Sequence, residues 1–475
     1  MPDVLTPDIC VIGAGSGGLS VAAAAAAFGV DVVLVEKAKM GGDCLNYGCV
    51  PSKALLSAAK SAKAHGADLK IGFEGVFEGV KFAKANDHVQ AVIAAIAPHD
   101  SVERFEGLGV KVLQDEARFV SSDCVLAGET EIRARRFVIA TGSSPAVPPI
   151  PGLAGVDFLT NETLFELREA PEHLIVIGGG PIGLEMAQAH RRLGSKVTVI
   201  EAQKALAKDL PEFAVVVLDA LRAEGVRILE GAAVNAVESS GEGIQVHFET
   251  EDGTSSVNGS HLLVAAGRKP NFGSLGLELA GIDVEGGGIK VDAGLRTTNR
   301  KIYAIGDVIG GLQFTHAAGY HAGLVIRSIL FRLPVHEDRT IIPWVTYTSP
   351  ELGHVGLSEQ QARDRHGNKV RVLTADYADN DRARAEDASV GQLRLVVGPR
   401  GRLLGGDIVG AQAGEMLNLL SLALSQKMTM GDLAGFVAPY PTLGELVRRA
   451  AVSYYAEAPK NTWVRRLLYL LRQFG

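Results

Sequence analysis

The sequence of 475 residues has few cysteines, no excess of positive charge and no long apolar segment. Four cysteines are too few for a disulfide-stabilised scaffold, so the cytosol is the expected compartment. The formal net charge of −7 argues against a general nucleic-acid-binding role. Residues 1–8 lack the basic and apolar stretches of a signal peptide, and the alanine-rich run 21–30 is too short to cross a bilayer. These absences leave a cytoplasmic globular protein as the expectation.

Glycine and apolar residues, in contrast, are plentiful. The chain contains 56 glycines, and 47% of its residues are hydrophobic, which is enough for a sizeable core. Its length suits about two to four domains. Abundant glycine is typical of α/β proteins, in which many strands lead into helices through tight turns.

A pattern of strand, glycine turn, helix and strand occurs twice. The first copy runs from an apolar strand at residues 8–12, through a small-residue helix at 19–28, to an acidic residue at 36. The second copy begins with a strand at 174–177 and ends at an acidic residue at 201. In both copies the acidic residue lies 18 positions after the third glycine. A single copy is weak evidence and is also compatible with an ordinary glycine-rich turn. Two copies in this context predict two dinucleotide-binding βαβ units.

Each residue of the fingerprint has a physical role. The first glycine permits the turn, the second lets the backbone approach a diphosphate, and the third lets the helix pack on the strand. The amides at the helix N-terminus attract the anion, and the acidic residue accepts hydrogen bonds from ribose hydroxyls. The carboxylate of Glu201 should repel a 2′-phosphate, which favours NAD(H), although Lys204 nearby leaves NADP(H) open. The predicted dinucleotide-binding residues are Gly13, Gly15, Gly18 and Glu36, and Gly178, Gly180, Gly183 and Glu201.

Two cysteines five positions apart, Cys44 and Cys49, lie between the two fingerprints, in a loop that leads into a helix expected to start near Pro51. A thiol at a helix N-terminus is shifted towards the thiolate, and Cys49 is the nearer of the two. A metal site would need two more ligands, and neither Cys nor His lies nearby. The pair therefore indicates redox chemistry, with a passive disulfide as the alternative. Cys10 and Cys124 are predicted to be small core or surface residues without a chemical role.

The rest of the chain divides by pattern. We expect helices at 50–64 and 87–105, a β-meander over 110–138, and a proline-rich linker at 145–151. The segments 137–142 and 262–268 close the two dinucleotide units in similar ways. From about residue 340, short β runs alternate with helices, which predicts an α+β domain.

With these motifs the chain resembles the class I pyridine nucleotide-disulfide oxidoreductases, the family of dihydrolipoyl dehydrogenase, glutathione reductase and mercuric reductase. The likeness extends over about residues 7–456, and its most specific part is GGDCLNYGCVPSK at 41–53. Supporting motifs are ATG at 140–142, AIGD at 304–307 and FTHAA at 314–318. The resemblance implies an α/β fold with two Rossmann-like dinucleotide-binding domains, for FAD and NAD(P), plus a C-terminal α+β dimerisation domain. The expected divisions are an FAD-binding domain at 1–150 and 268–338, an NAD(P)-binding domain at 151–267, a dimerisation domain at 339–457 and a tail at 458–475.

The resemblance also implies residue roles. Cys49 would face the flavin and Cys44 would exchange with the substrate, while Lys53 and Glu185 would pair beside the flavin. It implies a homodimer in which the C-terminal domain completes the partner's site. His316 receives no chemical role. The further cofactor-binding residues expected from the motifs are Thr141, Gly142, Asp307, Thr315 and Ala317 for FAD, and Gly267 at the end of the second unit.

One position departs from the family pattern. Disulfide-reducing members carry His-Pro-Thr followed by a glutamate, and the histidine serves as acid and base. This chain has Tyr440 in the place of that histidine, while Glu445 is retained. A tyrosine, with a reference pKa of roughly 10, is a poor proton shuttle near neutral pH. Mercuric reductases resemble the chain here, but their C-terminal cysteine pair is absent, since no cysteine follows Cys124.

The sequence therefore predicts an FAD-dependent enzyme that passes electrons from NAD(P)H to the Cys44–Cys49 disulfide. The expected acceptor is a small disulfide or a soft metal ion, with dihydrolipoyl dehydrogenase as an alternative and no resident metal. An alternative of another class is a redox-controlled, flavin-bearing binding component of a larger assembly.

The tail after residue 458 mixes apolar and basic residues. It can form an amphipathic helix that contacts a membrane or a protein, or one that packs on its own domain.

Overall fold

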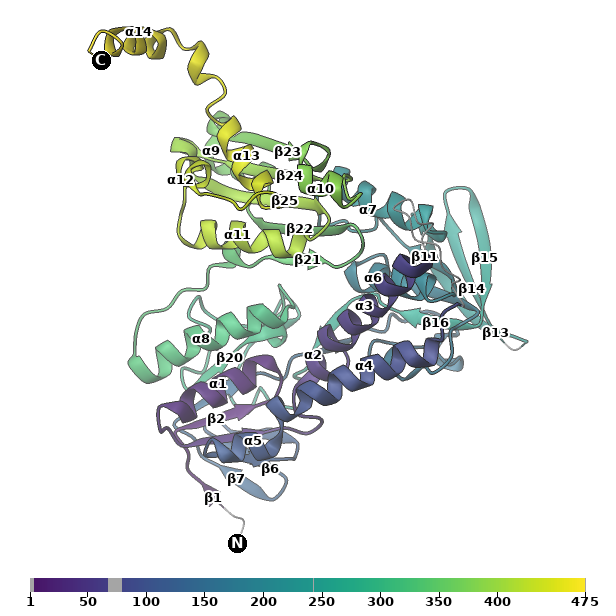
Figure 1. Ribbon diagram of the computed structural model, residues 1–475. Coiled ribbons are helices and arrows are strands. Elements are labelled where there is room, and N and C mark those ends of the chain that lie inside the picture. Colours follow the sequence, from purple (N-terminus) through teal and green to yellow (C-terminus); the bar gives the residue numbers. More distant parts are fainter. Residues whose placement is uncertain (1–3, 67–78, 242, 475) are drawn as a thin grey trace. The chain divides into compact units, whose positions relative to one another are not determined.

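The computed structural model describes residues 4–66, 79–241 and 243–474, and its helices and strands are drawn in Figure 1. The chain forms two compact units, each built from two segments. The first unit comprises Met1–Ala205 and Glu224–Glu337, and the second comprises Leu206–Ala223 and Asp338–Gly475. The finer division into an FAD-binding, an NAD(P)-binding and a dimerisation domain, at the limits given above, stays a prediction.

The first unit contains two parallel sheets, one for each copy of the repeated pattern. The larger sheet has five strands in the order β20-β8-β2-β3-β4, and the smaller has four in the order β12-β11-β10-β16. The central strands are buried along their whole length, as expected for parallel strands covered on both faces. The strands are β2 (Ile9–Ile12), β3 (Val32–Val35), β4 (Val110–Leu113), β8 (Arg136–Ile139), β20 (Ile302–Ala304), β10 (His173–Ile177), β11 (Lys196–Glu201), β12 (Val226–Glu230) and β16 (His261–Val264).

Each parallel sheet is accompanied by an antiparallel one. Strands β5, β6 and β7 form a meander whose β7 pairs in parallel with β1. Strands β13, β14 and β15 form a second meander, which was not predicted from the sequence. The predicted meander at 110–138 was too long, because its first and last strands belong to the five-stranded sheet. The meander strands are β1 (Val4–Leu5), β5 (Ala117–Ser121), β6 (Cys124–Ala127), β7 (Thr130–Ile132), β13 (Ala233–Ser240), β14 (Gly243–Thr250) and β15 (Gly253–Gly259).

The helices of the first unit differ from the sequence prediction at two places. The helix expected near Pro51 begins earlier, at Cys49, and the segment before it contains a short helix instead of a loop. The single helix expected at 87–105 is interrupted, because Pro98 cannot donate an intrahelical hydrogen bond. The helices are α1 (Ser16–Ala27), α2 (Gly42–Asn46), α3 (Cys49–Gly66), α4 (Phe82–Ile96), η1 (Ala97–Asp100), α5 (Val102–Gly107), α6 (Pro181–Arg192) and α8 (Thr315–Phe331).

The second unit is an antiparallel five-stranded sheet in the order β21-β22-β25-β24-β23, which has the α+β character predicted. Its core joins the sheet to helices α11 and α13 through buried Leu, Ile, Val and Met side chains. The elements are β21 (Trp344–Thr346), β22 (Glu351–Gly356), β23 (Arg371–Asp376), β24 (Gln392–Val397), β25 (Leu403–Gly410), α7 (Pro211–Ala223), α9 (Glu359–His366), α10 (Asp381–Ala385), α11 (Ala413–Ser425), α12 (Met430–Gly435), α13 (Glu445–Ser453) and α14 (Thr462–Leu471).

Helix α14 carries the tail of the chain. The side chain of Asn461 caps it by accepting a hydrogen bond from the backbone N–H of Trp463 at 2.9 Å. None of its residues is buried. Within the described ranges, the chain forms no helix with the length and hydropathy needed to span a membrane.

Candidate active site

Cys44 and Cys49 lie on two successive helices at the start of the redox segment. Cys44 lies in α2, and Cys49 is the first residue of α3. Both are free thiols, and each thiol is the largest influence on the pKa of the other. The two can therefore act as one dithiol.

The two thiols differ in acidity. The hydrogen bond from Cys44 lowers the pKa of Cys49 to about 6, with help from Thr315 and the charge of Lys53 and against the effect of burial. The same hydrogen bond, together with burial, raises the pKa of Cys44. Cys49 is thus the thiolate of the pair at neutral pH, as its place at a helix N-terminus predicts.

The N-terminus of a second helix also meets Cys49. Thr315 opens α8, and its hydroxyl lies 3.4 Å from Cys49 Sγ in a hydrogen bond. Ala317, two positions further along, is buried in the core. Because helix N-termini carry partial positive charge, α3 and α8 together favour negative charge at this sulfur.

The redox segment packs against the first glycine turn. The backbone N–H of Gly41 donates to Ala14 O at 2.9 Å. A Cβ added to Gly42 would lie 2.8 Å from Gly15 Cα. A ligand held by this turn therefore lies beside the segment that carries Cys44.

Lys53 and Glu185 connect the redox helix to the helix of the second glycine turn. Lys53 Nζ lies 2.8 Å from Glu185 Oε2 in an ion pair between α3 and α6, and the Glu185 side chain is only 5% exposed. Removing one partner of a buried ion pair is destabilising, so the pair holds the two helices together. Through it, α3 contacts the helix of the second copy.

The first glycine turn has the shape of a dinucleotide cradle. Gly13 has φ +103°, and a Cβ added to Gly18 would lie 1.8 Å from Gly13 O. At Gly15, in contrast, an added Cβ would meet no atom within 4 Å, and no side chain caps α1. The helix N-terminal amides therefore face open space, which fits the diphosphate of a dinucleotide such as FAD.

The second glycine turn repeats this geometry. Gly178 has φ +115°, and a Cβ on Gly183 would lie 2.0 Å from Gly178 O. The position of Gly180 is open, and no side chain caps α6. The residues present thus fit a second dinucleotide as well as a first.

The two acidic residues hold their turns in the same way. Glu36 Oε2 accepts from Ala14 N at 2.6 Å, and Glu201 Oε2 accepts from Gly179 N at 2.7 Å. The other carboxylate oxygen of each accepts the backbone N–H two residues further along the chain. Since a carboxylate has about four acceptor positions, each glutamate can still bind ribose hydroxyls.

Asp307 lies in a charged cluster that the sequence did not reveal. Ser143 Oγ donates to Asp307 Oδ2 at 2.6 Å, and Arg268 Nε donates to Ser143 Oγ at 2.7 Å. Arg268 Nη2 also lies 3.1 Å from Asp43 Oδ1, next to Cys44. Burial raises the pKa of Asp307, while Ser143 and Arg268 oppose that rise. The feature of the sequence that could have indicated this cluster is the position of Arg268 directly after Gly267.

The predicted closing segments of the two units pair with each other. Strand β9 (Ser143–Pro145) is antiparallel to β17 (Arg268–Pro270). Thr141 Oγ1 donates to Asn271 O at 2.5 Å, and the Asn271 amide donates back to Gly142 O at 3.0 Å. Gly267 has φ +120° and accepts the amide of Ala146 at 2.9 Å. These contacts place Arg268 beside Asp307.

Tyr440 and Glu445 belong to the second compact unit, whereas the other predicted site residues belong to the first. The Tyr440 hydroxyl donates to Asp381 Oδ2 at 3.0 Å, and the side chain is 71% exposed. This hydrogen bond raises the pKa of Tyr440. Glu445 opens α13, and its Oε2 accepts the amide of Thr442 at 3.4 Å. The hydroxyl proton of Tyr440 is thus used in the hydrogen bond to Asp381.

Other candidate features carry no redox chemistry. Cys10 and Cys124 are buried, and burial raises the pKa of both, as expected of packing residues. Within residues 4–66, 79–241 and 243–474, no three His, Cys, Asp or Glu side chains gather to hold a metal ion.

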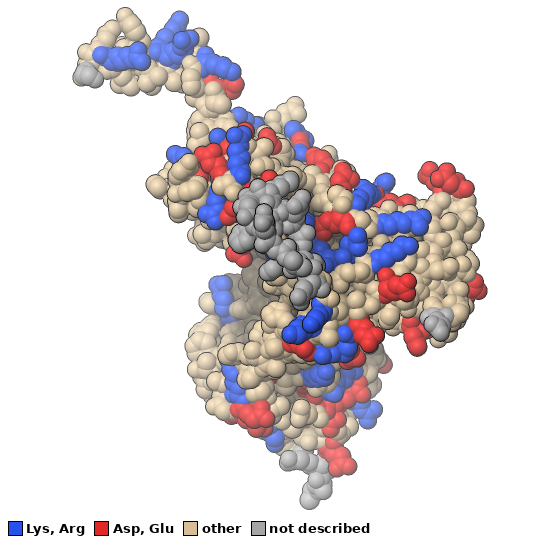
Figure 2. Space-filling model, turned by 45° about the vertical axis from the view of Figure 1, so that its right-hand side comes forward, with Lys and Arg blue, Asp and Glu red and all other residues tan. Residues whose placement is uncertain are grey.

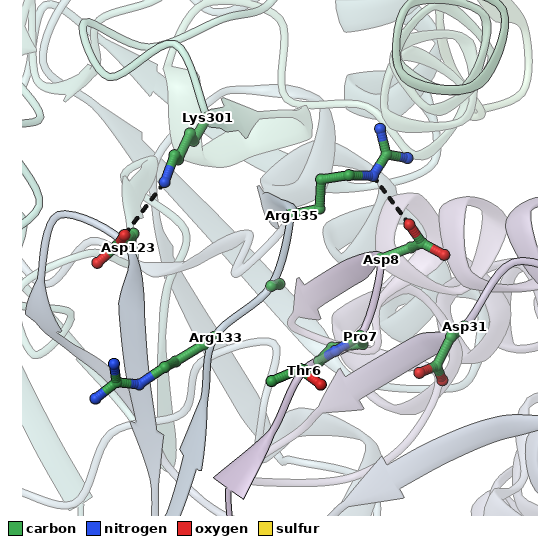
Figure 3. Close-up of a pocket in the computed structure, with 9 residues that line it drawn as sticks. Thr6, Pro7, Asp8, Asp31, Asp123, Arg133, Arg135 and Lys301 are labelled. Atoms are coloured by element: carbon green, nitrogen blue, oxygen red, sulfur yellow. Dashed lines mark hydrogen bonds and ion pairs between the residues drawn. The ribbon is translucent and has the colours of Figure 1, made fainter.

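A hollow of about 410 Å³ near β1 is lined by charged side chains of both signs (Figure 3). Lys301 pairs with Asp123 at 3.2 Å, and Arg135 pairs with Asp8 at 2.9 Å. No cysteine lines this hollow, so we assign it no chemistry.

Comparisons with known proteins agree with this geometry. Residues 7–322 match the family model "Pyridine nucleotide-disulphide oxidoreductase", and residues 342–451 match the dimerisation domain of the same family. A mercuric reductase of Bacillus cereus is 35% identical, over 95% of this chain and 72% of that protein. A dihydrolipoyl dehydrogenase of Geobacillus stearothermophilus is 36% identical, over 93% of this chain and 94% of that protein. Among solved structures, the Cu(II) complex of the HOCl-induced flavoprotein disulfide reductase RclA of Escherichia coli superposes with a TM-score of 0.83 and 29% identity, covering 93% of this chain and 98% of that one.

Proposed function

The chain belongs to the pyridine nucleotide-disulphide oxidoreductase family, and from this premise we propose that it reduces a soft, thiol-bound metal ion such as Hg(II). Members are enzymes that use FAD and NAD(P)H. When bound, FAD would carry two electrons from the nicotinamide to the cysteine pair. The net reaction is that NADH, a proton and a bis-thiolate Hg(II) complex give NAD⁺, Hg(0) and two thiols. The FAD-dependent oxidoreductase predicted from the sequence is thus confirmed, and the acceptor is the proposal.

The proposed acceptor rests mainly on the presence of Tyr440 in place of the family histidine. Reduction of an organic disulfide releases a thiolate that must be protonated, which is the task of the family histidine. Reduction of Hg(II) to Hg(0) breaks no S–S bond, and the thiolates that leave the metal can take their protons from the excess thiol in solution, so no acid is needed at that position. Tyr440 has a raised pKa and donates its hydrogen bond to Asp381, so it is a poor acid near neutral pH. One relative is named a mercuric reductase, and one similar solved structure is a Cu(II) complex, which supports the choice of a metal ion.

The chain's residues divide the work as follows in this proposal. The turn of Gly13, Gly15 and Gly18 holds the FAD diphosphate, and Glu36 binds the ribose. Cys49 stays a thiolate against the flavin, while Cys44 exchanges with the metal ion's thiol ligands.

The surroundings of the flavin are assigned in the same way. Asp307 and the amides near Thr315 and Ala317 would hold the flavin portion of FAD. The Lys53–Glu185 pair would lie beside it.

The nicotinamide donor is proposed to be NADH. The second glycine turn holds its diphosphate, and the Glu201 carboxylate sits where a 2′-phosphate would be repelled. The chain carries a dimerisation domain. We propose a homodimer in which Tyr440 and Glu445 lie beside the partner's dithiol. The cytoplasmic location stays a prediction.

Steady-state NADH oxidation by the purified FAD-loaded protein tests the acceptor. We expect turnover with Hg(II) in excess thiol and little with lipoamide or glutathione disulfide. Rapid turnover with lipoamide would instead identify a dihydrolipoyl dehydrogenase and overturn the proposal. Cys44→Ser should abolish metal-dependent turnover, whereas Cys124→Ser, a buried cysteine outside the site, is the matched control.

A further inference from the structure

Helix α14 and the residues beside it form an amphipathic surface that takes no part in the proposed redox reaction. The two family matches end before it, at residues 322 and 451. Counted from Trp463, the apolar residues Leu467, Leu470 and Leu471 recur at the fourth, seventh and eighth positions. At about 3.6 residues per turn, this spacing places them on one face of the helix.

The apolar face is exposed to solvent. Trp463 is 76% exposed, and Leu467, Leu470 and Leu471 are each more than half exposed. Phe474, just beyond the helix, is 81% exposed. Large apolar side chains gathered in one patch mark an interaction surface, whereas isolated ones do not.

The charged side chains of the tail are all basic. Residues 458–475 contain Lys460, Arg465, Arg466 and Arg472 and no acidic residue, although the whole chain carries a net charge of −7. Figure 2 shows Lys and Arg side chains gathered on this part of the chain. None of the three arginines forms an ion pair with a carboxylate of the described residues, and Arg466 lies over the Trp463 ring at 5.8 Å. The charge of this surface therefore complements a negative partner.

We propose that α14 lies in the plane of an anionic lipid bilayer and attaches the enzyme to it reversibly. A ten-residue helix rises only about 15 Å, which is half of a bilayer's hydrocarbon thickness, so it lies on the membrane and does not cross it. The aromatic and leucine face enters the acyl region, and the arginines contact lipid phosphates. Trp463 and Tyr469 suit the boundary between headgroups and chains.

Co-sedimentation of the FAD-loaded full-length protein with vesicles tests this proposal. We expect binding to vesicles of equal parts phosphatidylcholine and phosphatidylglycerol, and at least about a hundredfold weaker binding to pure phosphatidylcholine. Replacing Arg465, Arg466 and Arg472 with Gln should weaken binding to the anionic vesicles by about a hundredfold, since each basic residue contributes about fivefold. The matched control is a variant that replaces Arg365, Arg402 and Arg448, exposed arginines elsewhere in the second unit, with Gln.

The apolar face has its own variant. Leu467→Gln with Leu471→Gln should abolish vesicle binding while leaving NADH oxidation in solution unchanged, because α14 lies outside the redox site. Equal binding to neutral and anionic vesicles, or none to either, would overturn the proposal. A change of oligomeric state in the double-leucine variant, measured by light scattering, would instead show that a second copy covers this face.

Discussion

Residues 9–36 and residues 173–201 each form a strand, a glycine turn, a helix and a second strand. In both segments the glycines make the same contacts, and the glutamate at the end accepts two backbone N–H hydrogen bonds. Their surroundings differ. The first turn is packed against Gly41 and Gly42, directly before Cys44, whereas at the second turn the neighbour of Gly179 is Ala205. The same binding motif thus occurs twice, and the glycine turn of the first copy is the one that packs against the segment carrying the dithiol. The difference supports the proposal that the first copy binds the electron-relaying cofactor and the second binds the exchangeable donor.

Loss of the Cys49 sulfur should have the largest effect. We expect Cys49→Ser to lower kcat for acceptor reduction by about a thousandfold or more, because the path from the first site is cut. NADH should still bleach the yellow protein in a rapid-mixing experiment, since both dinucleotide sites remain. Normal acceptor turnover in this variant would mean that electrons leave without the dithiol. Cys124→Ser is the control.

Matched substitutions at the open glycines should separate the two sites. Gly15→Ala and Gly180→Ala each place a methyl group where the protein leaves space, so both should fold normally. Gly15→Ala should weaken FAD retention, and Gly180→Ala should raise the KM for NADH, each by about 10- to 100-fold. Thermal unfolding of both variants checks the fold. The assignment of the two turns is wrong if the effects are exchanged.

The acidity of Cys49 should depend on Lys53. In the reduced enzyme, labelling of Cys49 by iodoacetamide, followed by mass spectrometry, should be half-maximal near pH 6. Because the lysine charge stabilises the thiolate, Lys53→Met should move that midpoint upward by about one pH unit. Lys60→Met, an exposed lysine on the same helix, should leave it unchanged. A midpoint that stays near pH 6 in Lys53→Met would remove the lysine from this role.

The smallest effect concerns nucleotide preference. Glu201→Gln removes a negative charge from the second turn, so kcat/KM for NADPH relative to NADH should rise about fivefold. Glu36→Gln makes the same change at the first turn and should alter only FAD retention. An unchanged ratio of NADPH to NADH use in Glu201→Gln would mean that Glu201 does not select the donor.

Local patterns were the features that the sequence predicted well. The glycine turns, both parallel strand pairs and the cysteine pair follow rules of short range, and the structure contains each of them. The start of α3 was placed two residues too late, because Pro51 suits any position in a first turn. The Arg268 cluster escaped prediction because Asp43, Ser143 and Asp307 lie far apart in sequence and meet only through tertiary folding. The acidity of Cys49 was predicted from a helix terminus, but its largest cause is the hydrogen bond from Cys44.

The most direct test of the account is the ratio of lipoamide to Hg(II) turnover, expressed as kcat/KM, in the wild type and in Tyr440→His. The account predicts a low ratio in the wild type and a rise of about 100-fold or more on introduction of the imidazole, with metal turnover unchanged. A high ratio in the wild type, or no change in Tyr440→His, would contradict the claim that Tyr440 selects the acceptor.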